Sequence, residues 1–219
     1  SDWSSDVCSS DLGFFSLEMS SEQLATRIIS EQSGVPSNKI RRGAIDDDEF
    51  HRISEAAREM QQIPFFIDQT GGISIAQLTA RARRLKRQRG LDLLVVDYLQ
   101  LMSSGKKVES RQQEVSEFSR ALKLLAKELN IPVIAISQLN RNSEQTKDKK
   151  PEISQLRESG SLEQDADVVI LLHREGMFEK EHPRAGEADL ILAKQRNGPT
   201  GTVTVAFQGK YSRFANMKL

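Results

Sequence analysis

The fold of this chain is decided by the stretch Leu93-Leu94-Val95-Val96-Asp97-Tyr98-Leu99-Gln100-Leu101. Its first four residues form a continuous apolar run, which is typical of a parallel strand buried on both faces. The run ends in one carboxylate, and ligands of open α/β sheets bind at the carboxyl ends of the strands. The stretch therefore predicts a strand that delivers Asp97 to a ligand-binding edge. On this pattern alone, a core strand ending at an ordinary turn Asp is the alternative.

Three further segments place a charged or amide group at the end of an apolar run: Phe14-Phe15-Ser16-Leu17-Glu18-Met19, Ile136-Ser137-Gln138-Leu139-Asn140-Arg141 and Lys194-Gln195-Arg196-Asn197-Gly198-Pro199. With the run to Asp97, their order and spacing resemble the RecA-like motor domain of the DnaB family of replicative helicases. The resemblance implies an α/β fold with a RecA-like P-loop ATPase core, in which a mostly parallel sheet carries an antiparallel edge hairpin. Residues 13–219 are accordingly predicted to be a partial helicase motor domain.

Residues 1–12 lie outside this resemblance and have no apolar period. They read like the in-frame translation of a common sequencing-adapter oligonucleotide, so we expect them not to be native and exclude them from fold reasoning. A Ser/Asp-rich flexible leader is the alternative. In the family the phosphate-binding loop lies just before the position of Phe14, and no GxxxxGK[ST] motif occurs in the chain. We therefore expect a truncated gene product that is inactive by itself.

Composition narrows the class of protein. The chain has 219 residues, a formal net charge of zero and 28% charged residues, which argues against a bulk polyanion binder and leaves binding of nucleic acid to local basic loops. Its single cysteine, Cys8, excludes a disulfide scaffold, and the three histidines show no metal-ligand spacing. No run of eighteen apolar residues exists, so we expect no membrane span and a cytoplasmic location.

Periodicity places the other elements. Ser20 with Gln23 and Ser74 with Gln77 have the capping-box pattern and predict two helix starts. Apolar residues at spacings of three and four predict further helices over 46–61 and 111–129. The predicted strands are 14–18, 65–68, 93–97, 131–137, 168–172, 188–193 and 202–207, the last two joined through an Asn197-Gly198 turn.

Two carboxylates at the mouth of a nucleotide site can have separate roles in hydrolysis: one holds Mg²⁺, and the other orients or deprotonates the attacking water. By resemblance to the family, Glu18 is the catalytic base, and Asp97 binds the Mg²⁺ of ATP through water. Helix-dipole stabilisation near the Ser20 cap is the alternative for Glu18. With the resemblance, Gln138 is a catalytic and nucleotide-binding coupler, whose amide touches the γ-phosphate or the attacking water; a strand-end Gln that caps a loop is its alternative.

Lys194 and Arg196 flank Gln195, and alternate strand residues share a face. In the family these two cations reach into the neighbouring subunit's site as finger groups, which implies a homohexamer. A basic surface hairpin is the alternative. The family also grips single-stranded DNA with positions that match Arg157, Glu158 and Gly160, where small residues let backbone amides approach phosphate. A helix cap with an incidental Arg would explain the same residues.

The resemblance thus implies an ATP-dependent replicative helicase motor, with primase and a helicase loader as partners. A RadA-like or recombinase-type ATPase is the rival within the fold. An inactive module that binds single-stranded DNA or a partner subunit is the rival from another class. The basic residues of 81–89 are interpreted as a solvated helix face, because no aromatic residue for base stacking lies among them.

Overall fold

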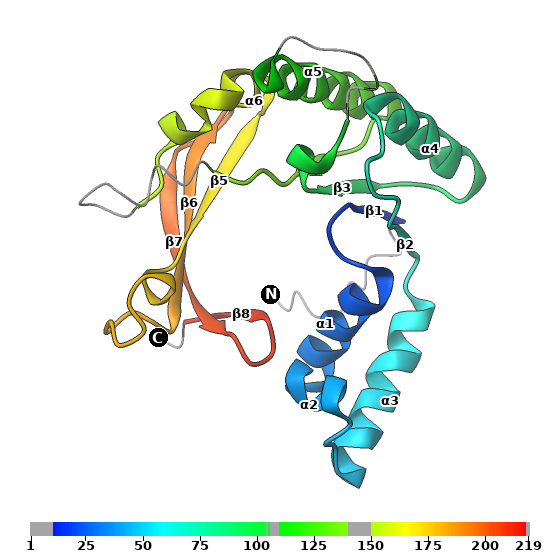
Figure 1. Ribbon diagram of the computed structural model, residues 1–219, viewed down its shortest axis with the longest axis vertical. Helices are drawn as coiled ribbons and strands as arrows, with labels where there is room; N and C mark the ends of the chain where they lie inside the picture. Colours follow the sequence, from blue (N-terminus) through cyan, green and yellow to red (C-terminus); the bar gives the residue numbers. More distant parts are fainter. Residues whose placement is uncertain (1–10, 104, 106–109, 140–149, 218–219) are drawn as a thin grey trace. The chain divides into compact units, whose positions relative to one another are not determined.

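The computed structural model describes residues 11–103, 105, 110–139 and 150–217, and for residues 157–160 the backbone alone. Its elements in chain order (Figure 1) are β1 (Leu12–Ser16), α1 (Ser21–Ser33), α2 (Ser37–Arg42), α3 (Asp47–Gln62), β2 (Phe65–Asp68), α4 (Ile75–Gln88), β3 (Leu93–Asp97), α5 (Arg111–Leu129), β4 (Val133–Ala135), α6 (Gly160–Asp165), β5 (Val168–His173), β6 (Glu187–Gln195), β7 (Gly201–Gln208) and β8 (Arg213–Asn216). The 3₁₀ turns include η1 (Leu99–Leu101), η3 (Ile153–Ser159) and η4 (Glu175–Met177).

The chain divides into two compact units, the first made of Ser1–Ala25 with Ser54–Gln138 and the second of Thr26–Ile53 with Leu139–Leu219. Two helices, α1 and α3, run from one unit into the other. The first strand, β1, begins at Leu12, the last residue of the segment predicted not to be native.

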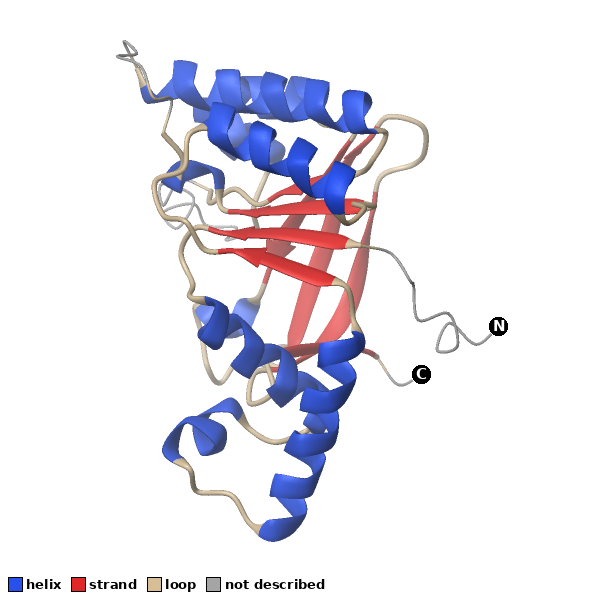
Figure 2. Ribbon diagram, turned by 90° about the vertical axis from the view of Figure 1, so that its right-hand side faces the viewer, coloured by secondary structure: helices blue, strands red, loops and turns tan. Residues whose placement is uncertain are grey.

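The first unit is built on a parallel sheet with strand order β2-β1-β3-β4. Helices α4 and α5 lie across one face of this sheet (Figure 2) and bury apolar stripes against it, among them Leu78 and Phe118, both fully buried. Gly13 lets β1 pack closely against the side chain of Leu91, because a Cβ at position 13 would lie only 2.8 Å from Leu91 Cδ1. The core of this unit therefore sits between the parallel sheet and two helices, as the apolar runs predicted.

The predicted helix boundaries of this unit are largely confirmed. Helix α5 spans Arg111–Leu129 as predicted and ends at Asn130, which adopts the left-handed conformation (φ 51°) that favours a helix stop. Ser74 and Gln77 form the predicted reciprocal capping box at the start of α4. Ser20 and Gln23 do the same before α1: Ser20 N donates to Gln23 Oε1 over 3.1 Å, and Gln23 N donates to Ser20 Oγ over 3.2 Å.

The second unit contains an antiparallel sheet with strand order β5-β6-β7-β8. One face packs against η3 and α6 through a small cluster of Leu156, Val169 and Leu171. The α/β class is confirmed, but the antiparallel strands form a four-stranded sheet of their own rather than an edge hairpin of the parallel sheet. Among the described residues, three-residue β4 pairs only with β3, and β5 pairs only with β6.

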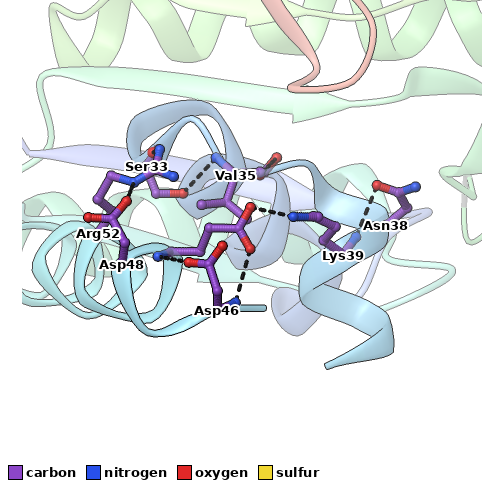
Figure 3. A network of polar contacts seen from close by, with 9 residues as sticks. Ser33, Val35, Asn38, Lys39, Asp46, Asp48 and Arg52 are labelled. Atoms are coloured by element: carbon purple, nitrogen blue, oxygen red, sulfur yellow. Dashed lines mark hydrogen bonds and ion pairs between the residues drawn. The ribbon is translucent and has the colours of Figure 1, made fainter. Parts of the chain in front are cut away.

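Residues 26–53 add a helical segment to the second unit, including α2, which was not predicted. Lys39 of α2 donates to the buried carboxylate of Glu49 over 2.5 Å (Figure 3). Asp46 and Glu49 exchange reciprocal bonds that cap α3, with Glu49 N donating to Asp46 Oδ1 over 2.8 Å. These contacts fix a short helix that carries no buried residue of its own and so leaves no periodic signal in the sequence.

Candidate functional site

Three neighbouring strands of the parallel sheet end at one edge. Ser16 of β1 pairs with Asp97 of β3, and Val96 of β3 pairs with Ala135 of β4. Because the strands are parallel, the segments that carry Glu18, Asp97 and Gln138 all leave the sheet at its carboxyl edge. The predicted adjacency of these segments is confirmed.

Glu18 does not end a strand, which corrects the predicted strand 14–18. The last strand residue is Ser16, whose buried hydroxyl donates to Met19 O over 2.7 Å and closes a tight turn before the Ser20 cap. Glu18 therefore lies in this turn, two residues beyond the partner of Asp97, with an exposed side chain. Within the described part of the chain, its carboxylate has no hydrogen bond or ion pair.

Asp97 is the last residue of β3 and is half-buried, after three buried residues of the run. Its carbonyl oxygen accepts a hydrogen bond from Leu17 N over 2.7 Å, which extends the β1–β3 ladder by one bond beyond Ser16. The backbone around Asp97 is thus fixed by the sheet on the side of the turn that carries Glu18. The prediction that a buried strand delivers this carboxylate to the sheet edge is confirmed.

Gln138 lies three residues beyond the end of β4, which is shorter than the predicted strand 131–137. The β3–β4 ladder continues past the strand through Ile136, whose N–H donates to Val96 O over 2.9 Å and whose carbonyl accepts from Leu99 N over 3.0 Å. Gln138 itself is held by the side chain of Gln100: Gln138 N donates to Gln100 Oε1 over 3.3 Å, and Gln100 Nε2 donates to Gln138 O over 3.1 Å. The Gln138 side chain is exposed.

Lys194 lies in β6, in the second unit, and its side chain is half-buried. The ammonium group donates to Glu163 O over 2.5 Å and to Gln164 O over 3.4 Å. These carbonyls belong to the last turn of α6, where a cation complements the carboxyl end of a helix. Lys194 therefore has an internal structural partner within its own chain.

Arg196 is the first residue after β6, which ends at Gln195, and its N–H donates to Asp167 O over 2.8 Å. That Arg196 shares a strand face with Lys194 stays a prediction. The turn that contains it folds tightly over Gln195, since a Cβ at Gly198 would lie 2.7 Å from Gln195 Nε2. Arg196 pairs with Asp167 over 3.4 Å, with both side chains more than half exposed. Such an exposed pair contributes at most about 1 kcal/mol.

The predicted DNA-contacting residues Arg157, Glu158 and Gly160 lie where η3 meets α6, and their side chains are outside the described part of the structure. The backbone is helical here. Gln155 N donates to Glu152 O over 3.0 Å at the start of η3, and Leu156 is buried against β5, which draws this segment onto the sheet.

A buried ionic cluster in the second unit was not predicted. Arg184 bonds both carboxylate oxygens of Asp189, over 2.6 and 3.3 Å, and also Glu187 over 2.6 Å. The Arg184 guanidinium lowers the pKa of the buried Asp189, and Thr204 Oγ1 donates to the same carboxylate over 2.8 Å. His173, also buried, lies 3.1 Å from Glu175 and lowers the pKa of that carboxylate. These contacts join Arg184 of the β5–β6 connection to Asp189 of β6, and Asp189 to Thr204 of β7.

The described residues, 11–103, 105, 110–139 and 150–217, contain neither a metal-binding cluster nor a membrane-spanning helix. No group of three or more His, Cys, Asp or Glu side chains could hold a metal ion there. None of the helices in these ranges has the length and apolar character that crossing a bilayer requires.

The sequence model of one protein family, the DnaB-like helicase C-terminal domain, matches residues 4–216 of this chain. The chain belongs to this family. It is 59% identical over 93% of its length to the replicative DNA helicase DnaB of Leifsonia xyli subsp. xyli, of which it covers 45%. It is 58% identical to the DnaB of Mycobacterium intracellulare, of which it covers 35%. The chain thus spans less than half the length of these DnaB relatives.

Solved structures agree with the family assignment. A DnaB-like replicative helicase studied with its primase interactions superposes with a TM-score of 0.90 at 36% identity, covering 95% of this chain and 51% of that one. A separately solved ATPase domain gives the same TM-score of 0.90 at 37% identity, covering 95% of this chain and 75% of that one. The RecA-like fold expected from the resemblance to the DnaB family is confirmed, and the recombinase alternative is set aside.

Proposed function

We propose that the chain is part of the ATP-hydrolysing motor of a replicative DNA helicase, which moves along single-stranded DNA and unwinds the duplex. The observation that carries this proposal is the strand order β1-β3-β4. It brings the segments bearing Glu18, Asp97 and Gln138 to one edge of a parallel sheet in a member of the DnaB-like family.

Within this site, Glu18 is proposed as the base that orients or deprotonates the attacking water. Its carboxylate is exposed and, in the described ranges, is engaged by no cation that would hold it away from a substrate. A general base must be free to reach the proton that it removes. Gln138 is proposed to contact the γ-phosphate, since its side chain is exposed at the edge while its backbone is fixed.

Asp97 is proposed to bind Mg²⁺ that accompanies ATP. Magnesium is held in nucleotide sites by one or two carboxylates together with substrate phosphates and water, not by an all-protein cage. A single half-buried carboxylate at the end of a strand fits that donor set. The bound ion would supply neutralisation of charge on the phosphates.

No phosphate-binding loop of the GxxxxGK[ST] type occurs in these 219 residues. The backbone amides and the Lys of such a loop supply most of the phosphate contacts in P-loop ATPases. We therefore propose that the 219-residue chain alone does not turn over ATP. Activity is therefore tested in a chimeric helicase, in which residues 13–219 replace the corresponding stretch of the Leifsonia xyli relative. The relative supplies the segments that the 219-residue chain does not span.

Arg196 is proposed as a finger that completes the site of a neighbouring subunit in a homohexamer. Its pairing with Asp167 is weak and exposed, whereas Lys194 is engaged with the carboxyl end of α6. Of the two predicted finger cations, Arg196 is the one that can leave its partner at little cost. A contact of this kind is heterologous, and it closes only in a ring.

Single-stranded DNA is the proposed nucleic-acid ligand, with Arg157, Glu158 and Gly160 as its contacts. Primase and a helicase loader are proposed partners. Support for primase comes from the similar DnaB-like helicase whose structure was determined with its primase interactions. Because the similar relatives are bacterial replicative helicases, we propose that the protein acts in the cytoplasm.

The test compares the chimeric helicase with the 219-residue chain. We expect the chimera to hydrolyse ATP faster when single-stranded DNA is added and to unwind a forked duplex, and the 219-residue chain to show no turnover. A folded chimera that binds nucleotide without hydrolysis would contradict the proposal. Salt-sensitive binding of single-stranded DNA by the 219-residue chain, together with an inactive chimera, would favour the inactive-module alternative.

A further inference from the structure

The backbone ladder between β3 and β4 stops before it reaches Gln138. Its last bonds are those of Ile136, to Val96 O over 2.9 Å and from Leu99 N over 3.0 Å. Gln138 lies two residues further, where the chain is leaving the sheet. Without another partner, its peptide N–H and carbonyl at this exposed position would bond to water and the backbone would fluctuate.

The side chain of Gln100 supplies that partner. A carboxamide carries one acceptor and one donor group, the same pair that a strand backbone offers. Gln100 Oε1 accepts from Gln138 N over 3.3 Å, while Gln100 Nε2 donates to Gln138 O over 3.1 Å and to Ser137 Oγ over 2.8 Å. Exchanging the oxygen and nitrogen would set donor against donor, so this network fixes the orientation of the amide.

Gln100 is itself held in place from α5. Arg111, the first residue of that helix, donates from Nη2 to Gln100 O over 2.6 Å and from Nη1 to Met102 O over 3.3 Å. Its guanidinium also pairs with Glu114 and lies 5.9 Å from the centre of the Phe118 ring. The backbone of the η1 turn is therefore anchored on a packed helix, which fixes the point from which the Gln100 side chain extends toward Gln138.

The Gln138 carboxamide, by contrast, makes no hydrogen bond within the described residues and is exposed. We propose that Gln100 is a positioning residue: by clamping the backbone of Gln138 it fixes where the Gln138 side chain emerges from the sheet edge. It thereby ties the segment that follows Asp97 to the segment beyond β4 that carries Gln138. This inference rests on the proposed role of Gln138 as a contact for the γ-phosphate.

The clamp is tested first in the 219-residue chain. Gln100→Met keeps the length of the side chain and removes both polar groups, and Gln100→Glu keeps the acceptor but sets a carboxylate against Gln138 O. We expect amide hydrogen exchange of Gln138 to accelerate about fivefold or more in both variants, while that of Ile136, held by the ladder, stays unchanged. Gln61→Glu, at an exposed position of α3, is the matched control. Unchanged exchange at Gln138 would overturn the clamp.

The consequence for turnover is tested in the chimeric helicase. Gln100→Glu should lower DNA-stimulated kcat about fivefold to tenfold and leave KM for ATP unchanged, because the Gln138 side chain is misplaced while nucleotide binding is retained. Gln100→Glu combined with Gln138→Ala should be no slower than Gln138→Ala alone, since Gln100 acts through Gln138. Full additivity of the two losses would overturn the inference.

The two hypotheses fail in different ways. If Gln138→Ala leaves DNA-stimulated kcat unchanged, the proposed role of Gln138 is wrong, whatever the exchange data show. If Gln138→Ala lowers kcat and Gln100→Glu does not, Gln138 keeps its role and the positioning role of Gln100 is wrong. Thermal unfolding of Gln100→Met, which introduces no charge, separates a loss of folding from a loss of positioning.

Discussion

Ser16 and Asp97 are register partners on neighbouring parallel strands, and Leu17 N donates to the carbonyl oxygen of Asp97 over 2.7 Å. Glu18 follows directly, so the two carboxylates are carried by backbone segments that the sheet holds side by side. Parallel strands lie about 4.8 Å apart. The relative placement of these segments therefore does not depend on any loop conformation beyond one tight turn.

Glu18→Gln in the chimeric helicase tests the base. We expect nucleotide binding to remain normal and DNA-stimulated turnover to fall at least about a hundredfold, because the amide cannot accept a proton while Asp97 is untouched. Single-turnover phosphate release and equilibrium binding of a fluorescent nucleotide measure the two quantities. Glu55→Gln, an exposed carboxylate on α3, is the control. Near-normal turnover of Glu18→Gln would remove Glu18 from the catalytic residues.

The buried cluster around Asp189 predicts an acid-sensitive second unit. Because Arg184 lowers the pKa of Asp189 in the folded state, the pair contributes stability that is present above the ordinary Asp range near pH 4. That contribution is lost as the pH falls through the folded pKa. Asp189→Asn should therefore cost about 2 kcal/mol in the free energy of unfolding at pH 7 and much less in strong acid.

Urea unfolding of the 219-residue chain at several pH values measures this effect. Glu179→Gln, an exposed carboxylate in the same connection, should leave the pH profile unchanged. An Asp189→Asn variant with the same pH dependence as the parent chain would show that the pKa of Asp189 does not differ between the folded and unfolded states.

Lys194 and Arg196 are expected to differ in their effect on folding. Lys194→Ala removes a half-buried ammonium from two carbonyls at the end of α6 and should cost about 1–2 kcal/mol in the free energy of unfolding. Arg196→Ala removes one exposed pair and should cost less than about 0.5 kcal/mol. Chemical unfolding of the two variants measures both losses in the free energy of unfolding. Equal losses would contradict the distinction between Lys194 as a structural cation and Arg196 as a functional one.

Local patterns predicted much of the fold. The apolar run that ends at Asp97 predicted β3, and apolar residues at spacings of three and four predicted α5 with both of its ends. Each of these signals lies within one element and reflects the burial of its side chains. The capping boxes at Ser20 and Ser74 were also readable, since a cap joins residues only three apart.

Features set by distant contacts were not predicted. A local contact was missed as well: β1 ends at Ser16, where the chain turns and the Ser16 hydroxyl donates to Met19 O over 2.7 Å, and no periodicity reveals this turn. Arg196 begins the turn after β6, and its N–H bonds to Asp167 O, a contact between residues 29 positions apart in sequence. The clamp from Gln100 joins residues 38 positions apart in sequence, so only the folded chain shows that this amide belongs to the candidate site.

Arg157→Ala in the chimeric helicase tests the DNA contact expected from the family. Loss of one phosphate contact should weaken binding of single-stranded DNA and reduce the slope of log affinity against log salt by up to about one unit. Fluorescence anisotropy with a labelled oligonucleotide at several salt concentrations measures both. Arg58→Ala, on the exposed side of α3, is the control, and unchanged affinity and slope with intact folding would exclude Arg157 as a phosphate contact.

The sharpest test concerns Arg196, because a finger acting on a neighbour and a cation acting on its own subunit predict opposite results when subunits are mixed. Arg196→Ala alone should assemble and bind ATP but hydrolyse it slowly, by about a thousandfold or more if it acts as a finger. Mixed rings of Arg196→Ala with Glu18→Gln should regain activity wherever an intact Glu18 meets an intact Arg196 from the next subunit. DNA-stimulated phosphate release after subunit exchange measures the gain.

A role within one subunit cannot produce this rescue, because every subunit in the mixture then carries one broken site. Strictly sequential firing around the ring would mask the gain, so the experiment includes doping of each variant into wild-type rings. If activity falls in proportion to the fraction of variant subunits, single interfaces hydrolyse ATP independently. A steeper fall indicates that the subunits must fire in a fixed order around the ring. Native gels establish that mixed rings form. With independent firing and mixed rings both demonstrated, absence of rescue would rule out Arg196 as a finger in the neighbouring site and leave it as a surface cation of the β6–β7 turn.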